Sequence, residues 1–209
     1  MSKQKPALNR SVILFGNGEV PKHKRALEIL ESSSSYICID GGADKLKALG
    51  FEPTLILGDL DSVSEKHDCK IIRLEDESAS DLEKSILWCL DNNVDRISLL
   101  GFSGLRDDHN LLALQTLKIY SKDIRLTLYS NFSKIICIKE KMVFKSTPGQ
   151  TVSIVTSEKG TNLSTHGLKY ALKDKKLDHI TQGLSNIAIG NRFSVEASKW
   201  VWVFQNYTS

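Results

Sequence analysis

The first 131 residues of this 209-residue chain alternate short apolar runs, rich in β-branched side chains, with stretches of helical periodicity. Strands are expected at residues 11–15, 36–39, 55–57, 70–74, 96–100 and 124–129, and helices at 21–31, 45–49, 80–90 and 111–117. Parallel strands need crossover connections, and helices supply them. The alternation therefore predicts an α/β domain built on a parallel sheet.

Clusters of glycine, carboxylate and small polar residues follow the predicted strands. The third strand runs into Gly58, Asp59 and Asp61, the second into Asp40, and the fifth into a glycine-rich turn that carries Arg106. Ligands of open parallel sheets bind outside the carboxyl ends of the strands. Taken alone, Asp59 and Asp61 fit an acidic turn, but side chains two residues apart in extended chain can also converge on one divalent cation. The loops together indicate a metal and phosphate site on one rim.

The segment at residues 80–84 has two interpretations. Ser80 and Glu83 fit a capping box, which predicts that a helix begins here. Asp81 then lies in the first turn, where the helix dipole favours a carboxylate in any protein. The same position would make Asp81 a third oxygen ligand of the cation and would let Lys84, one turn along, reach a phosphate.

Two glycine-containing turns have the composition of phosphate-binding loops. The turn at residues 16–18 leaves room for a phosphate to meet backbone N–H groups, although such a glycine pair also fits an ordinary tight turn. Arg106, on the turn after the fifth strand, suits bidentate contact with phosphate. Asp108 and His109 beside it either fix this loop or take part in chemistry. The sixth strand closes on Ser130 and Asn131.

The chain changes character after residue 132. Helical periodicity disappears, and short β-rich runs follow at 135–138, 141–144, 151–155, 187–189, 193–195 and 201–204. Closely spaced short strands separated by turns predict a small antiparallel sandwich. We therefore expect an α/β domain over residues 1–131 and an all-β domain over 132–209, the latter packed on the first domain or on a second subunit.

Composition excludes several functional classes. The 28 Lys and Arg residues against 25 Asp and Glu leave a net charge of +3, too little to indicate a nucleic-acid partner. No apolar run approaches the roughly 20 residues of a membrane span, and the N-terminal residues lack the apolar core of a signal peptide. The four cysteines are scattered without the spacing of zinc ligands or a disulfide framework. A cytoplasmic protein without a membrane partner is expected.

Five motifs, in order, resemble those of the thiamin pyrophosphokinase family. They are Asp-Gly-Gly-Ala-Asp at 40–44, Gly-Asp-Leu-Asp-Ser at 58–62, Ser-Asp-Leu-Glu-Lys at 80–84, Gly-Leu-Arg-Asp-Asp-His at 104–109 and Gly-Leu-Ser-Asn at 183–186. The resemblance spans nearly the whole chain, and the order of the motifs makes it specific. It implies a Rossmann-like nucleotide-binding domain followed by a β-sandwich, a homodimer that holds thiamine between its subunits, and transfer of the diphosphate unit of ATP to thiamine.

The resemblance also assigns roles by position. It implies that Asp59, Asp61 and Asp81 bind Mg²⁺ and that Lys84 and Arg106 face the phosphates of ATP. The residues expected to bind substrate are Asp40, Asp44, Ser80, Asp108, His109, Asn131, Ser185, Asn186 and Trp202. The chain departs from the family pattern Asp-Gln-Asp-x-Thr-Asp at residues 76–81, where Glu77 replaces Gln and Ser80 replaces Thr.

Some assignments stay open at the level of sequence. Trp200 and Trp202 are candidates for stacking on the pyrimidine ring of thiamine, and they fit a core or an interface equally well. Asp59, Asp61 and Asp81 are the pool for a general base, from which the sequence selects none. The alternative functions are a metal-dependent phosphoesterase that uses Asp59, Asp61, Asp108 and His109, and a non-catalytic nucleotide sensor.

Overall fold

A computed structural model describes residues 9–58, 67–74 and 78–208. The expected parallel strands are β1 (Ser11–Phe15), β2 (Tyr36–Ile39), β3 (Leu55–Gly58), β4 (Lys70–Arg73), β5 (Arg96–Leu100) and β6 (Arg125–Tyr129). They lie in the order β4-β3-β2-β1-β5-β6, and every neighbouring pair among them is parallel. The prediction of a parallel sheet for this part of the chain is confirmed.

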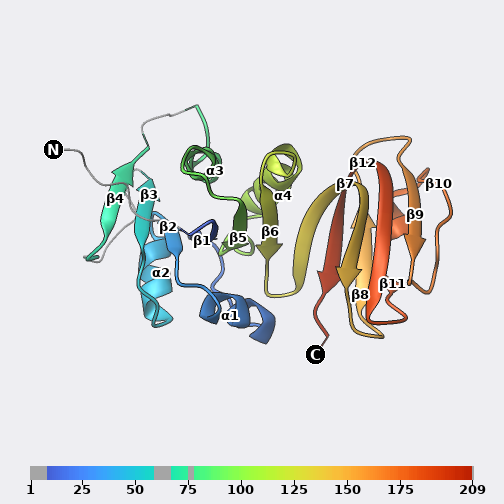
Figure 1. The fold of residues 1–209 in the computed structure, drawn as a ribbon, viewed down its shortest axis with the longest axis horizontal. Helices are drawn as coiled ribbons and strands as arrows, with labels where there is room; N and C mark the ends of the chain where they lie inside the picture. Colours follow the sequence, from blue (N-terminus) through green and yellow to red (C-terminus); the bar gives the residue numbers. More distant parts are fainter. Residues whose placement is uncertain (1–8, 59–66, 75–77, 209) are drawn as a thin grey trace.

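The four α-helices within the described residues cover both faces of this parallel part (Figure 1). They are α1 (Lys24–Glu31), α2 (Gly42–Ala48), α3 (Asp81–Asp91) and α4 (Asp107–Tyr120). Successive residues of β1 show why: Leu14 packs in the cluster that α3 and α4 complete, whereas Phe15 packs in the cluster under α1 and α2. Side chains alternate across a strand, so a strand that is apolar at every position must be buried on both faces.

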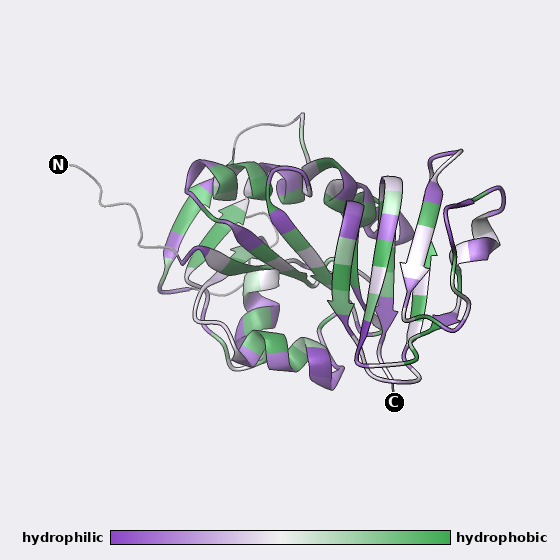
Figure 2. Ribbon diagram, turned by 45° about the vertical axis from the view of Figure 1, so that its right-hand side comes forward, coloured by the Kyte–Doolittle hydropathy of each residue, from purple (hydrophilic) through white to green (hydrophobic). Residues whose placement is uncertain are grey.

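The second half is almost entirely β-structure. Its strands are β7 (Ser133–Lys145), β8 (Thr151–Val155), β9 (Asn162–His166), β10 (Lys175–Lys176), β11 (Asn186–Ile187) and β12 (Arg192–Asn206), with a short 3₁₀ helix, η1 (Ile180–Gly183). Strand β12 pairs antiparallel with β7 on one side and with β9 and then β8 on the other. Figure 2 shows hydrophobic and hydrophilic bands along the long strands, as expected of strands with only one face on a core.

The two halves share one mixed sheet. Strand β6 pairs antiparallel with β7 through Leu128 with Ile135 and Tyr129 with Lys134, so that the sheet runs on through 12 strands. The polar residues near 140 and 198 resemble turns, so the sequence predicts two short strands in place of β7 and two in place of β12. Backbone pairing continues across both places, with a register shift in β12 between Ala197 and Val201. Strands β9 and β10 were missed, since only Leu163 supplies a large apolar side chain there.

Candidate active site

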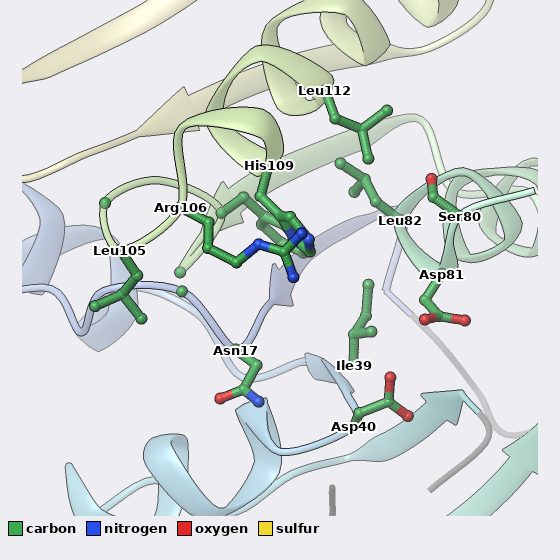
Figure 3. Close-up of a pocket in the computed structure, with 14 residues that line it drawn as sticks. Asn17, Ile39, Asp40, Ser80, Asp81, Leu82, Leu105, Arg106, His109 and Leu112 are labelled. Carbon is green, nitrogen blue, oxygen red and sulfur yellow. The ribbon is translucent and has the colours of Figure 1, made fainter. Parts of the chain in front are cut away.

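A cavity of about 490 Å³ opens at the carboxyl edge of the parallel strands (Figure 3). It lies where the strand order reverses, because the chain moves from β1 to β2, β3 and β4 on one side and to β5 and β6 on the other. Such a reversal separates two neighbouring loops and leaves a crevice between them. The lining comes from the loops after β1, β2 and β5 and from the first turns of α3 and α4.

Glycines let the loops after β1 and β5 pack directly against each other. The Gly18 N–H donates to the Gly101 carbonyl at 2.6 Å, and the Gly16 N–H donates to the Leu100 carbonyl at 2.8 Å. A β-carbon at Gly18 would lie 2.5 Å from the Gly101 oxygen, so no larger residue fits. Both N–H groups are thus committed to the neighbouring loop, and the structure favours the tight-turn interpretation of residues 16–18 over the phosphate-binding one.

Asp40 is held in an unusual backbone conformation at the end of β2. Its φ is 45°, and the residue is only 9 % exposed. Its Oδ1 lies 1.8 Å from the point where a β-carbon of Gly58 would stand, and Gly58 itself has a φ of 141°. Gly58 therefore has to be glycine, and the Asp40 carboxylate is brought to the end of β3. Asp59 follows Gly58 in the sequence. Asp59 and Asp61 both lie outside the described residues.

The first turn of α3 brings Ser80 and Asp81 to the cavity. The predicted capping box is confirmed: the Ser80 hydroxyl accepts from the Glu83 N–H at 3.3 Å, and the Glu83 carboxylate accepts from the Ser80 N–H at 3.4 Å. The Asp81 carboxylate lies 2.6 Å from the Lys84 ammonium, which also donates to the Leu74 carbonyl at 3.3 Å. Lys84 is not among the described residues that line the cavity.

The start of α4 carries Arg106, at the N-cap position, and the imidazole of His109 in the first turn. Both line the cavity, and Figure 3 shows Arg106 extending across it. Asp108 accepts from Arg106 through both carboxylate oxygens, from Nε at 3.0 Å and from Nη2 at 2.5 Å. The hydrogen bond from Arg106 lowers the pKa of the Asp108 carboxyl to about 2. Asp108 thus fixes the direction of the guanidinium, the first of the two roles that the sequence left open for it.

Two predicted substrate residues, Asn131 and Asp44, make structural contacts away from the cavity. Asn131 accepts from the Lys22 N–H at 2.6 Å and donates to the Val20 carbonyl at 3.1 Å, which holds the segment before α1. Asp44, in α2, accepts a hydrogen bond from Nε2 of the His67 imidazole at 2.7 Å. His67 itself was missed, because an isolated histidine before a weak strand gives no local signal.

Ser185 and Asn186 lie in the β-rich half, and neither is among the described lining residues. Asn186 is buried and clamps Tyr170, accepting from its N–H at 3.0 Å and donating to its carbonyl at 2.7 Å. Ser185 is exposed, and only its backbone N–H bonds to Ser153. Figure 1 places β11, which begins at Asn186, far along the molecule from α3 and β2. Within one chain these residues and the cavity are therefore separate.

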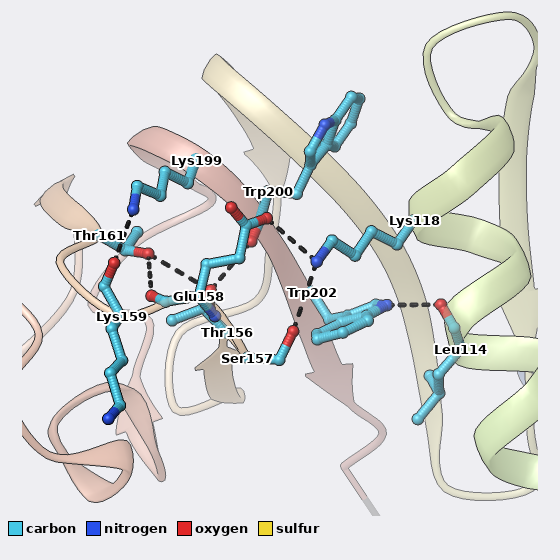
Figure 4. Close-up of polar contacts among 10 residues, drawn as sticks. All are labelled: Leu114, Lys118, Thr156, Ser157, Glu158, Lys159, Thr161, Lys199, Trp200 and Trp202. Carbon is cyan, nitrogen blue, oxygen red and sulfur yellow. Dashed lines mark hydrogen bonds and ion pairs between the residues drawn. The ribbon is translucent and has the colours of Figure 1, made fainter.

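Trp202 belongs to the core, one of the two interpretations that the sequence left open (Figure 4). It is 6 % exposed, and its indole Nε1 donates to the Leu114 carbonyl of α4 at 2.7 Å. The ammonium of Lys118 lies 5.9 Å from the centre of its ring and 3.1 Å from the Glu158 carboxylate. Packing between α4 and β12 occupies the ring within one chain, and the expectation that Trp202 contacts a substrate stays a prediction.

Sequence analysis overlooked the apolar lining of the cavity. Phe102, Leu105 and Leu112 face it together with Ile39 and Leu82. Phe102 also packs where a side chain on Gly16 would lie. No local pattern distinguishes such residues from core residues, so only the assembled loops reveal them.

A cavity at a strand-order reversal, with carboxylates on one wall and an arginine on another, defines an α/β protein that binds a charged ligand at the carboxyl edge of its parallel strands. Comparison with known proteins specifies the family. Residues 26–128 match the model for "Thiamin pyrophosphokinase, catalytic domain", and residues 134–204 match that for "Thiamin pyrophosphokinase, substrate-binding domain". The chain belongs to the thiamin pyrophosphokinase family.

Individual relatives agree with the family models. The chain is 24% identical to thiamin pyrophosphokinase 1 of Caenorhabditis elegans, over 92% of this chain and 91% of the relative. It is 29% identical to the thiamine pyrophosphokinase of Bacillus subtilis, over 75% and 77% of the two chains. In fold it is similar to the crystal structures of thiamine pyrophosphokinase from Bacillus subtilis (TM-score 0.81, 20% identity, 95% and 99% coverage) and Candida albicans (0.80, 22%, 96% and 90%).

These matches make the chain an enzyme of the pyrophosphokinase type and do not support the phosphoesterase or sensor alternatives. Within the part of the chain that the structure describes, no group of three or more His, Cys, Asp or Glu side chains is arranged around a metal position. Among the same residues, no helix is long and apolar enough to cross a membrane.

Proposed function

We propose that this chain transfers the diphosphate unit of ATP to the hydroxyl of thiamine, which gives thiamine diphosphate and AMP. The match of the catalytic and substrate-binding family models to consecutive parts of one chain carries the proposal. In the reaction, the hydroxyl oxygen of thiamine forms a bond to the β-phosphorus of ATP, the bond from that phosphorus to the oxygen on the α-phosphorus breaks, and the hydroxyl proton is released. The parallel, Rossmann-like part would bind ATP, and the β-rich part after residue 131 would bind thiamine and a second subunit.

The described cavity has the charges that this reaction requires. Arg106 presents a planar, bidentate donor whose direction Asp108 fixes. Positioning and charge stabilisation supply most of the catalysis in phosphoryl transfer, so a guanidinium held in place before ATP binds is suited to the phosphates. His109 lines the same space and can donate a hydrogen bond to bound substrate, whereas the Ser80 hydroxyl already donates to the Glu83 carboxylate at 3.0 Å.

Carboxylates on the opposite wall fit a hard divalent cation. Asp40 and Asp81 line one cavity although 41 residues separate them in the sequence, and their oxygen donors are the type that Mg²⁺ prefers. We therefore assign the Mg²⁺ site to Asp81, with Asp59 and Asp61 as further ligands and Asp40 beside them. When bound, Mg²⁺ would neutralise charge on the transferred diphosphate.

A homodimer with thiamine at the subunit interface is part of this proposal. Ser185 and Asn186 lie apart from the cavity within one chain, so they can meet a substrate there only from a second subunit. A two-fold dimer would present two such composite sites. We place the reaction in the cytoplasm, which agrees with the free cysteines Cys38, Cys69, Cys89 and Cys137.

The decisive experiment incubates the protein with ATP and Mg²⁺, with and without thiamine, and follows AMP. A pyrophosphokinase forms AMP only when thiamine is present, and thiamine diphosphate appears in equal amount. Release of phosphate without thiamine would indicate the phosphoesterase. Absence of AMP under both conditions, with nucleotide still bound, would indicate the sensor.

A further inference from the structure

A second cavity, of about 390 Å³, lies beside α1 and shares no described lining residue with the candidate active site. Its floor is a row of cross-strand neighbours, Tyr129 on β6, Lys134 on β7 and Gln205 on β12. Directly paired residues point to the same face of a sheet. The eight-residue helix α1 borders this face through Arg25, Glu28 and Ile29.

Lys134 is a partly buried cation of this cavity without an ion-pair partner among the described residues. The residue is partly buried, and burial lowers the pKa of its ammonium group. No described carboxylate forms an ion pair with it. A charge removed from water without a partner is unfavourable, so an anion that enters the cavity would be bound.

Tyr207 supplies a second group without a partner. Its hydroxyl oxygen is buried and makes no hydrogen bond to any of the residues that the structure describes. Its ring stacks on the His23 imidazole, with ring centres 4.1 Å apart, which holds the hydroxyl in place. Burial raises the pKa of Tyr207, so the hydroxyl keeps its proton and can donate it to an anion.

The charge around the cavity is strongly positive. Arg25 and Lys145 also line it, and a neighbouring cavity of about 590 Å³ shares Tyr129 and Lys134 and adds four cations: Arg96, Arg125, Lys139 and Lys141. Glu28, which pairs with Arg25 at 3.2 Å, is the one carboxylate among the described lining residues of both cavities. The whole chain carries only three more cations than anions, so this is a local concentration of charge.

We propose that the cavity beside α1 binds a phosphoryl group, of inorganic phosphate or of a small phosphorylated molecule, through Lys134, Arg25 and the Tyr207 hydroxyl. The three donors come from α1, from β7 and from the segment after β12, and a tetrahedral oxyanion can accept from three directions at once. The volume suits a small ligand. The proposal does not rest on the proposed catalytic function.

The test measures the Tm of the full chain in sodium phosphate against sodium chloride at equal ionic strength. A ligand that binds the folded state raises Tm. We expect phosphate to raise the Tm of the wild type and of Lys24→Met, an exposed control on α1. We expect no rise in Lys134→Met and a reduced rise in Tyr207→Phe, with phosphate affinity in titration calorimetry at least tenfold weaker in Lys134→Met.

An active-site variant separates the two possible phosphate sites. In Arg106→Gln, phosphate should still raise Tm. A rise in the Tm of this variant with AMP would show that the cavity beside α1 also takes a phosphoryl group that is part of a nucleotide. Phosphate binding that survives Lys134→Met but is lost in Arg106→Gln would overturn the proposal. The proposal would also be overturned if phosphate bound to neither the wild type nor Lys134→Met and this substitution changed the sedimentation coefficient. The cations would then serve a contact between two copies of the chain.

Discussion

Asp81 is the described carboxylate on which the metal assignment can be tested most directly. It faces the cavity from the first turn of α3, and Lys84, which pairs with it at 2.6 Å, is on the same helix. A carboxylate in this position is compatible both with the helix dipole and with a bound cation, which is why the sequence left two interpretations.

Replacing Asp81 by Asn keeps the shape of the side chain and removes its charge. We expect the rate of AMP formation to fall by about 100-fold or more, as for loss of an electrostatic group in an active site, and Tm to change little. Asp91→Asn, at the other end of the same helix, is the matched control and should keep wild-type activity. Wild-type activity in Asp81→Asn would exclude Asp81 as a metal ligand.

The Arg106 and Asp108 pair has a defined pH dependence. The hydrogen bond from Arg106 lowers the folded-state pKa of Asp108 to about 2, below its ordinary value, so the pair is fully formed above the unfolded pKa and is lost only as pH falls through about 2. We therefore expect Asp108 to stay ionised above pH 4, with no change of its carboxyl signal in a titration followed by carbon-13 NMR. In Arg106→Gln the carboxyl pKa should return toward its ordinary value, and an unchanged pKa would show that Arg106 does not hold it.

At the scale of elements, one tryptophan joins the two halves of the protein. The Trp202 indole donates to a carbonyl in α4, and Lys118 of the same helix pairs with Glu158 beyond β8 (Figure 4). The alternation of side chains along β12 predicts on which face of the strand the Trp202 ring lies. It does not predict that a carbonyl group of α4 lies within hydrogen-bonding distance of the indole. Helix α4 is thereby fixed to β12, and the start of this helix carries Arg106 and His109 to the cavity.

Trp202→Phe removes the hydrogen bond to Leu114 together with part of a buried ring. We expect the free energy of unfolding to fall by about 2 kcal/mol, the sum of a net hydrogen bond and lost apolar burial. Trp200→Phe removes an indole that makes no hydrogen bond to the described residues of α4, and it should cost less in the same urea titration. Equal losses for the two variants would contradict the assigned role of the indole N–H.

At the scale of the whole molecule, the separation of Ser185 from the cavity within one chain predicts shared sites in a dimer. Asp81→Asn disables the proposed metal site, and Ser185→Arg introduces a bulky cation where cationic thiamine is proposed to bind. If each site uses Asp81 from one subunit and Ser185 from the other, random heterodimers of two inactive variants regain one intact site in two.

Mixing the two variants in equal amounts after subunit exchange should therefore restore activity to about a quarter of the wild-type level, since half of the dimers are mixed. The measurement is AMP formation before and after exchange. A mixture that stays as inactive as its components would contradict a site formed across subunits, and sedimentation of each variant alone checks that both still form dimers.

The sequence by itself determined the order of strands and helices in the first half, the capping box at Ser80 and the carboxylates and arginine at the strand ends, because these depend on residues near one another in the chain. Tertiary structure decided which of these groups hydrogen-bond to each other. The Gly18 N–H donates to the Gly101 carbonyl, Arg106 donates to the Asp108 carboxylate, and the Trp202 indole donates to a carbonyl of α4. It also decided that one sheet passes through both halves and that Lys134 and Tyr207 meet at one cavity. Such pairings join residues far apart along the chain, and no local pattern records them.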